Sequence, residues 1–138
     1  MREKYKRSKT YRYEFIKKHS GIHGYYMCSY CGRIMKKDNM QVDHVIPVHL
    51  SQKNWFYRLL LLGRNVNATS NLVAACPKCN KHKSAKGGVW VLKGALGPYL
   101  QPLIWIFFIA LMPYYIVWFY NNVAPQMATE IFTLVRNL

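Results

Sequence analysis

Two C-x-x-C pairs constrain the fold of this chain more than any other feature of its sequence. The pairs are Cys28–Cys31 and Cys76–Cys79, and the chain contains no other cysteine. Two such knuckles together supply four thiolates, which complete a tetrahedral zinc shell; a shell made only of cysteine is closed and structural. A redox role for each pair is the alternative, but the thioredoxin-like context that it requires is missing. The pattern predicts a small domain in which bound Zn²⁺ replaces part of a hydrophobic core.

Charge is distributed very unevenly along the 138 residues. Between Arg2 and Lys93 lie 19 of the 20 Lys and Arg residues and four of the five acidic residues, so this part carries a net charge of +15 and the rest is neutral. Such a compact basic region attracts polyanions, either nucleic acid or an anionic membrane surface. We expect nucleic acid as the partner; a ribosomal-type or merely solubilising charge is the alternative.

Residues 100–120, LQPLIWIFFIALMPYYIVWFY, form an apolar stretch, and no charge occurs between Lys93 and Glu130. About 20 apolar residues suffice to span a bilayer. A core helix of a soluble protein is the alternative, but a domain this small cannot surround a helix that is apolar on every face. Only an obligate homo-oligomer could do so. We therefore expect a linker at 91–99, one transmembrane helix at 100–120 and a short C-terminal tail at 121–138.

The cations close to this stretch predict its orientation. Four lysines precede it within about 20 residues, whereas Arg136 is the only cation that follows it. The N-terminal residues also lack the apolar segment of a cleavable signal peptide. We therefore expect a single-pass membrane protein with its basic domain in the cytoplasm, where the four thiols stay reduced for zinc.

Local patterns predict mixed helices and strands before the apolar stretch. Residues 1–20 form a basic, tyrosine-rich segment, which either contacts nucleic acid or packs its tyrosines on the domain that follows at 21–90. Alternation predicts a strand that ends near Asp43 and His44, and a second strand at 71–75. We expect an apolar helix at 54–62, and a further helix that follows the second cysteine pair and ends at Gly87 and Gly88.

Three strings of the chain resemble the HNH endonucleases, also called ββα-metal nucleases: CSYCGR, VDHVIPV and NLVAACPKCNKHKS. The cysteine pairs, the DH and NL dipeptides and the CNxxK motif occur in the family's order between about Cys28 and Lys86. The resemblance implies an α+β fold, namely a small ββα-metal nuclease domain stapled by a Cys₄ zinc site. It also implies a hydrolase that cleaves phosphodiester bonds of DNA, with RNA left open as a substrate.

Phosphodiester hydrolysis requires an activated water and a Lewis acid beside the phosphate. A neutral imidazole suits the general base, and a carboxylate suits a hard cation such as Mg²⁺. The resemblance assigns the base to His44, a catalytic Mg²⁺ or Mn²⁺ to Asp43 and Asn80, and an organising role in the loop to Asn71. Lys83 lies one helical turn from Asn80, so we expect it to face the same phosphate. We expect no small-molecule cofactor.

Two alternatives to a membrane-anchored nuclease stay open at this point. One is a non-catalytic zinc-ribbon protein of the membrane that binds nucleic acid through a vestigial DH pair. The other is a toxin or phage effector that uses the nuclease as its harmful part. The gap of 27 residues between His44 and Asn71 is long for the family. Its apolar insert, 54–62, could cover the zinc module or dip into a membrane surface.

Overall fold

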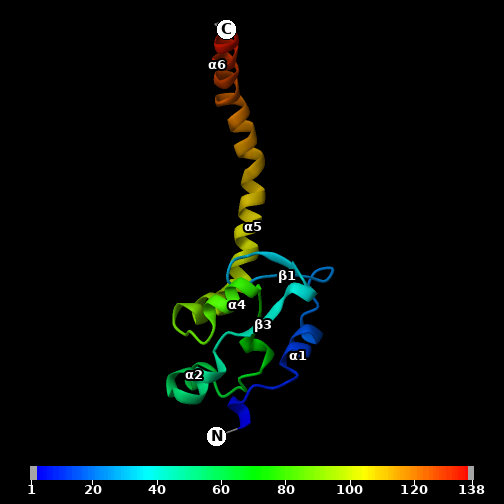
Figure 1. Cartoon of the computed structure of the whole chain (residues 1–138), viewed down its shortest axis with the longest axis vertical. Coiled ribbons are helices and arrows are strands. Elements are labelled where there is room, and N and C mark those ends of the chain that lie inside the picture. The colour runs from blue at the N-terminus through cyan, green and yellow to red at the C-terminus, as the bar shows by residue number, and fades with distance from the viewer. Residues whose placement is uncertain (1–2, 137–138) are drawn as a thin grey trace. The chain divides into compact units, whose positions relative to one another are not determined.

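The computed structural model describes residues 3–136, in two units that comprise Met1–Pro102 and Leu103–Leu138 (Figure 1). Short 3-10 helices are labelled η. In chain order the elements are η1 (Glu3–Tyr5), α1 (Tyr11–Lys18), β1 (Tyr25–Met27), β2 (Ile34–Lys36), η2 (Lys37–Asn39), β3 (Gln41–His44), α2 (Val48–Lys53), α3 (Trp55–Leu60), η3 (Thr69–Asn71), β4 (Leu72–Ala75), α4 (Pro77–Lys83), α5 (Val89–Asn122) and α6 (Ala124–Arg136).

Two antiparallel pairs of strands form the sheets of the first unit. β3 pairs with β4 in a register that sets Asp43 opposite Val73 and His44 opposite Leu72. These two strands are the ones predicted from the sequence. The other pair, β1 and β2, forms a hairpin around the first cysteine knuckle, where Gly32 adopts the left-handed backbone conformation (φ +71°) that a tight turn requires. With its helices, the first unit confirms the predicted α+β class.

The core of the first unit packs around β3 and β4. Every residue of β4 is buried, and Phe15 from α1 packs against the same cluster. The N-terminal segment also reaches a second, smaller cluster, in which Tyr5 contacts Ile46, Leu61 and Val66. The basic N-terminal segment is therefore part of the folded domain, although individual tyrosines such as Tyr13 remain exposed.

The long connection between β3 and β4 contains two short helices, α2 and α3, where the sequence predicted one. Asn54 separates them because its side chain accepts the backbone N–H of Phe56 and so starts α3 anew. The chain then reverses at Leu62 and Gly63, both with positive φ. Most apolar side chains of α3 are exposed, among them Trp55 and Leu59.

Helix α4 begins directly after Cys76, with Pro77 in its first turn. It ends at Lys83, earlier than the predicted stop at Gly87 and Gly88, because Ser84 leaves the helical region with φ +48°.

Helix α5 begins at Val89, so residues 91–99, which were expected to be a linker, are helical. Gly94 and Gly97 make this possible because each lets the helix lie directly against the domain. A Cβ atom at Gly97 would come within 1.8 Å of the carbonyl oxygen of Ser29, and one at Gly94 would press on Tyr30 and Val45. The first turns of α5 are thus a packed part of the first unit.

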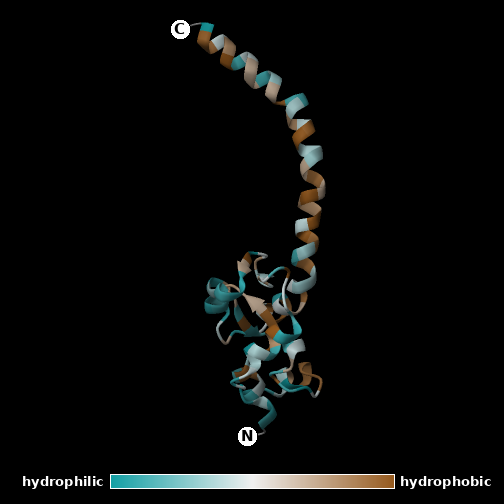
Figure 2. Ribbon diagram, turned by 90° about the vertical axis from the view of Figure 1, so that its right-hand side faces the viewer, coloured by the Kyte–Doolittle hydropathy of each residue, from teal (hydrophilic) through white to brown (hydrophobic). Residues whose placement is uncertain are grey.

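The remainder of α5 and α6 make up the second unit, and brown, hydrophobic segments recur along α5 in Figure 2. Within the described residues, one helical stretch, Val89–Arg136, is long and apolar enough to cross a membrane by length and composition. Its side chains in the second unit are almost all exposed. The predicted apolar stretch at 100–120 lies wholly inside it.

Candidate active site and zinc centre

The four cysteines converge on one point of the first unit. Their Sγ atoms all lie within 4.8 Å of one another, and Cys31 Sγ is 3.9 Å from Cys76 Sγ. A tetrahedral ion with Zn–S bonds of about 2.3 Å places its sulfurs about 3.8 Å apart, so this set fits Zn²⁺. Burial raises the pKa of the Cys28 and Cys79 thiols, which favours the neutral thiol until a cation is bound. The predicted knuckle site is therefore present.

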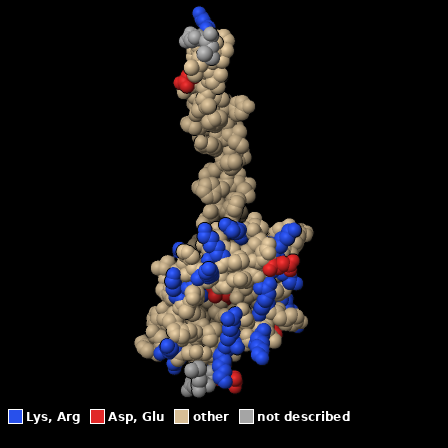
Figure 3. Space-filling model, in the orientation of Figure 1, with Lys and Arg blue, Asp and Glu red and all other residues tan. Residues whose placement is uncertain are grey.

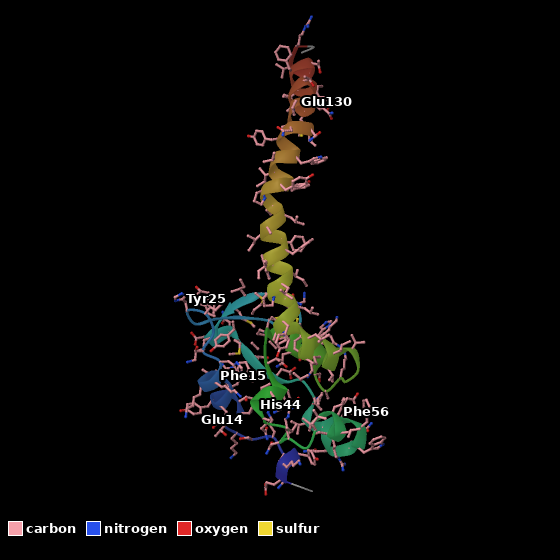
Figure 4. All side chains as sticks on the ribbon, turned by 180° about the vertical axis from the view of Figure 1, so that it is seen from behind. Glu14, Phe15, Tyr25, His44, Phe56 and Glu130 are labelled. Atoms are coloured by element: carbon pink, nitrogen blue, oxygen red, sulfur yellow. The ribbon has the colours of Figure 1, made fainter. Side chains whose placement is uncertain are left out.

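The ends of β3 and α4 line one cavity of about 480 Å³ together with part of the N-terminal segment. Its lining residues are Arg7, Val42, Asp43, His44, Pro47, Val48, His49, Asn80, Lys81, Lys83, Ser84 and Ala85. Three residues predicted from the sequence, Asp43, His44 and Asn80, thus meet at one place, although they come from segments almost 40 residues apart. His44 lies in the interior of the first unit (Figure 4).

The carboxylate of Asp43 is held by two donors on the same oxygen. Tyr30 Oη donates to Asp43 Oδ2 at 2.6 Å, and Lys83 Nζ lies 2.8 Å from that atom. Burial and the charge of Asp43 raise the pKa of Tyr30, so the phenol stays protonated and remains a donor. With Oδ2 doubly occupied, Oδ1 is the oxygen that the carboxylate can offer to a cation.

Lys83 occupies a different place from the one that helical spacing suggested. Its side chain is fully buried, and its ammonium also donates to the backbone oxygen of His44 at 2.6 Å. α4 packs this lysine inward against β3, where its ammonium pairs with the carboxylate of Asp43. Lys83 also lines the cavity beside Asn80, and its contact with phosphate stays a prediction.

The imidazole of His44 is fixed by a side chain that the sequence analysis did not select. His44 Nε2 lies 3.1 Å from Asn67 Oδ1, and that oxygen also accepts the backbone N–H of Ser8 at 2.9 Å. The other end of the amide, Asn67 Nδ2, donates to the carbonyl of Lys6 at 2.6 Å. These backbone partners determine which end of the amide is oxygen, so Nε2 must carry the proton and Nδ1 keeps its lone pair.

The environment of His44 also favours the neutral ring. Burial lowers the pKa of His44, and this effect outweighs the opposing hydrogen bond to Asn67. Tyr11 packs on the imidazole with its ring centre 4.9 Å away. His44 also lines the cavity, and a neutral imidazole in that position has the chemistry of a general base.

Asn71 and Asn80 occupy separate positions. Asn71 is buried: its Oδ1 accepts the backbone N–H of Ile46 at 2.9 Å, and its Nδ2 donates to the carbonyl of Val66 at 2.8 Å. It therefore ties the loop after His44 to the segment at Val66, while the imidazole of His44 is held by Asn67. Asn80 lines the cavity, and its Nδ2 donates to Gln41 Oε1 at 2.6 Å.

Residues 28–86 match the model of a protein family described as HNH endonuclease. This segment is similar to an HNH endonuclease domain. The match contains both cysteine pairs, Asp43, His44 and Asn80, and it confirms the family that the motifs predicted. It indicates nuclease activity on nucleic acid. Comparison with curated proteins and with solved structures gave no significant match.

Residues outside the matched segment complete the surroundings of the HNH site. Ser8 and Lys6 orient Asn67, Tyr11 covers His44, and Arg7 lines the cavity and stacks on Tyr11, with its guanidinium 4.7 Å from the ring centre. Sequence spacing does not link these residues to His44. Tyr30 could have been noticed because it stands between the two cysteines of the first knuckle.

Basic side chains cover the face of the HNH unit seen in Figure 3, with few acidic ones among them. This agrees with the net charge of +15 between Arg2 and Lys93. Such a surface provides contacts to phosphates without selecting a sequence of bases.

Proposed function

We propose that this chain is a membrane-anchored, metal-dependent HNH endonuclease that hydrolyses phosphodiester bonds of DNA, with its nuclease domain in the cytoplasm. The observation that carries the proposal is the hydrogen bond between His44 Nε2 and Asn67 Oδ1, at the edge of a cavity that Asp43 and Asn80 also line. A protein that only binds nucleic acid does not require a buried histidine in a fixed orientation. Here the orientation of His44 is held by the hydrogen bond from Nε2 to Asn67.

In this proposal His44 Nδ1 takes the proton of the attacking water, and the imidazolium that forms is stabilised through Nε2–H by Asn67 Oδ1. Asp43, through Oδ1, and the amide oxygen of Asn80 would hold Mg²⁺ or Mn²⁺. Both are the hard oxygen ligands that these ions prefer. When bound, the ion would supply Lewis-acid stabilisation of the charge that develops on phosphate. Lys83 and Tyr30 keep the carboxylate of Asp43 in place.

DNA is the substrate that the surface charge supports, because a duplex offers a dense row of phosphates to a basic surface. Arg7 and Lys81 line the cavity, so in this proposal they contact phosphates near the scissile bond. RNA shares this backbone chemistry, so parallel assays with both polymers distinguish the two substrates.

A plasmid-nicking assay on the detergent-solubilised full chain tests the catalytic part. We expect cleavage with Mg²⁺ or Mn²⁺, none with EDTA, and a loss of about 10²- to 10⁴-fold in rate for His44→Ala, the usual contribution of a general base. His82→Ala, an exposed histidine on α4, is the matched control and should cleave like the parent. Cleavage by His44→Ala within a few-fold of the parent would remove His44 from the base role.

The membrane anchor rests on the apolar character of the helical stretch Val89–Arg136 and on the lysines that precede it. A reporter fused after Leu138 tests the orientation. A reporter enzyme that is active only outside the cytoplasm should be active in this fusion. A reporter that is active only in the cytoplasm should be inactive. Extraction of the chain into the soluble fraction by alkaline carbonate would contradict the anchor.

A further inference from the structure

The β1–β2 hairpin exposes apolar and cationic side chains on one face. Tyr25 stands opposite Lys36 in the register, and Met27 stands opposite Ile34, so these four side chains share a face. The other face, with Tyr26 and Met35, is buried in the core. The exposed fractions are 45% for Tyr25 and 55% for Ile34, although both are large hydrophobic residues.

The loop that precedes β1 and the turn that precedes β2 extend this face. Ile22 is 79% exposed, and Arg33 is exposed beside Ile34. Between Gly21 and Lys37 the chain has three cations and no acidic residue. We call Ile22, Tyr25, Arg33, Ile34 and Lys36 the hairpin surface. None of its members lines the candidate active-site cavity.

The hairpin surface lies beside the part of α5 that leads into the apolar stretch. Gly97 packs on the carbonyl of Ser29, two residues after β1. A groove of about 350 Å³ runs along this contact, and Ile22 and Tyr25 line it together with Pro98 and Pro102. Figure 4 shows Tyr25 at the edge of the first unit.

This position has a consequence for depth if the apolar stretch spans a bilayer. From Gly97 to residue 100 an α-helix rises only about 5 Å. The headgroup layer on each side of the hydrocarbon is about 5–8 Å thick. A hairpin that contacts Gly97 therefore stands at the level of the lipid headgroups.

We propose that the hairpin surface docks onto anionic lipid headgroups beside the membrane span; the proposal rests on the membrane anchor proposed above. Its composition fits that partner, because tyrosine and isoleucine enter the boundary between headgroups and acyl chains while arginine and lysine pair with lipid phosphates. Exposed isoleucines add nothing to a contact with a nucleic-acid backbone. Docking holds the basic domain against the headgroup layer of the bilayer.

Hydrogen–deuterium exchange on the full chain in nanodiscs tests this docking. One set of discs contains phosphatidylcholine alone, and the other also contains phosphatidylserine. We expect amide exchange in residues 21–37 to slow several-fold in the anionic discs relative to the neutral discs and to detergent. Equal amide exchange in anionic discs, neutral discs and detergent would overturn the docking. The same result is expected if the hairpin surface binds a protein partner and not lipid.

Matched variants locate the effect on the hairpin surface. In the double variant Ile22→Glu with Lys36→Glu, the protection by anionic lipid should disappear. The control is Trp55→Glu with Lys53→Glu, which makes the same change of charge at exposed positions of α2 and α3 and should keep the protection. Equal loss in both variants would contradict a specific surface. Both double variants should match the parent in zinc content and in nicking activity in detergent. If the hairpin variant does not, the comparison of anionic and neutral discs on the parent chain decides whether the hairpin surface docks onto lipid.

Carbonate extraction separates this inference from the anchor. A chain that stays in the membrane fraction while residues 21–37 exchange freely in anionic discs overturns the docking alone. A chain that is extracted overturns the anchor and the docking together. Neither result bears on nuclease activity, which is measured in detergent.

Discussion

Lys83 Nζ lies 2.8 Å from Asp43 Oδ2, and the lysine is completely buried. The ammonium comes from the end of α4 and the carboxylate from the end of β3, so this ion pair joins the two elements that form the ββα nuclease site. Its partner Tyr30 belongs to the first zinc knuckle. The zinc centre and the candidate catalytic carboxylate are therefore connected through one side chain.

Replacing Lys83 with methionine should destabilise the domain by about 3–5 kcal/mol, because a largely buried carboxylate would lose its counter-charge. Denaturant unfolding of the purified chain, followed by tyrosine and tryptophan fluorescence, measures this loss. Lys81→Met, on the exposed side of the same helix, is the control and should leave the midpoint nearly unchanged. Similar midpoints for the two variants would show that the ion pair adds nothing to stability.

Replacing Asn67 with alanine should slow cleavage by about 10- to 100-fold, the usual effect of removing the partner that orients a functional histidine. DNA affinity should stay the same, because Asn67 is not among the residues that line the cavity. Nitrogen NMR of the parent should show His44 protonated at Nε2, and the variant should show a mixture of tautomers. Asn65 Oδ1 accepts both the backbone N–H and the Nδ2–H of Asn67, so Asn65→Ala should shift the rate in the same direction by a smaller factor. A parent protonated at Nδ1 would refute the assignment.

The rate of cleavage should fall on the acidic side of neutrality, with half of the maximum at a pH below 6.5. Burial lowers the pKa of His44 from its usual 6.5, so the ring stays neutral and able to accept a proton at pH values where a free histidine is charged. The same shift means that the unfolded chain binds this proton first, so the contribution of His44 to stability declines as the pH drops below about 6.5. A profile of kcat/KM against pH checks the rate, and a half-maximum above 6.5 would contradict the neutral, buried ring.

The purified protein should contain one zinc ion per chain, and stripping that ion should unfold the first unit. The Sγ atoms of four cysteines lie within 4.8 Å of one another, and these thiols release their protons when a cation binds. A domain this small depends on such a metal for its folding stability. Mass spectrometry measures the zinc, and circular dichroism follows the fold during chelation. Cys79→Ser should bind zinc weakly and lose structure, whereas Ser29→Ala, within the first knuckle, should do neither. A folded domain with well under one equivalent of zinc would disprove the structural role.

Features that depend on short-range spacing were predictable from the sequence alone. The cysteine pairs, the two strands of the ββα site and the long apolar stretch each follow from a local pattern, because turn geometry, strand alternation and bilayer thickness act on neighbouring residues. The motifs that mark the family, including Asp43 and His44, are local in the same way. The uneven distribution of charge already indicated a polyanionic partner.

Tertiary structure alone decided which side chains surround the candidate catalytic pair. Asn67 is 23 residues from His44 and Tyr30 is 13 from Asp43. Whether these pairs come into contact depends on how the connection between β3 and β4 and the first zinc knuckle pack against β3. Helical periodicity placed Lys83 near Asn80, and the packing of α4 against β3 decided that its ammonium pairs with Asp43. The helical segment at 91–99 likewise depends on Gly94 and Gly97, whose missing side chains matter only where another part of the chain lies against them. Local patterns determined the family motifs and the apolar stretch. Packing determined the hydrogen bond between His44 and Asn67, the ion pair between Lys83 and Asp43 and the start of α5, because these depend on contacts between segments that are far apart in sequence.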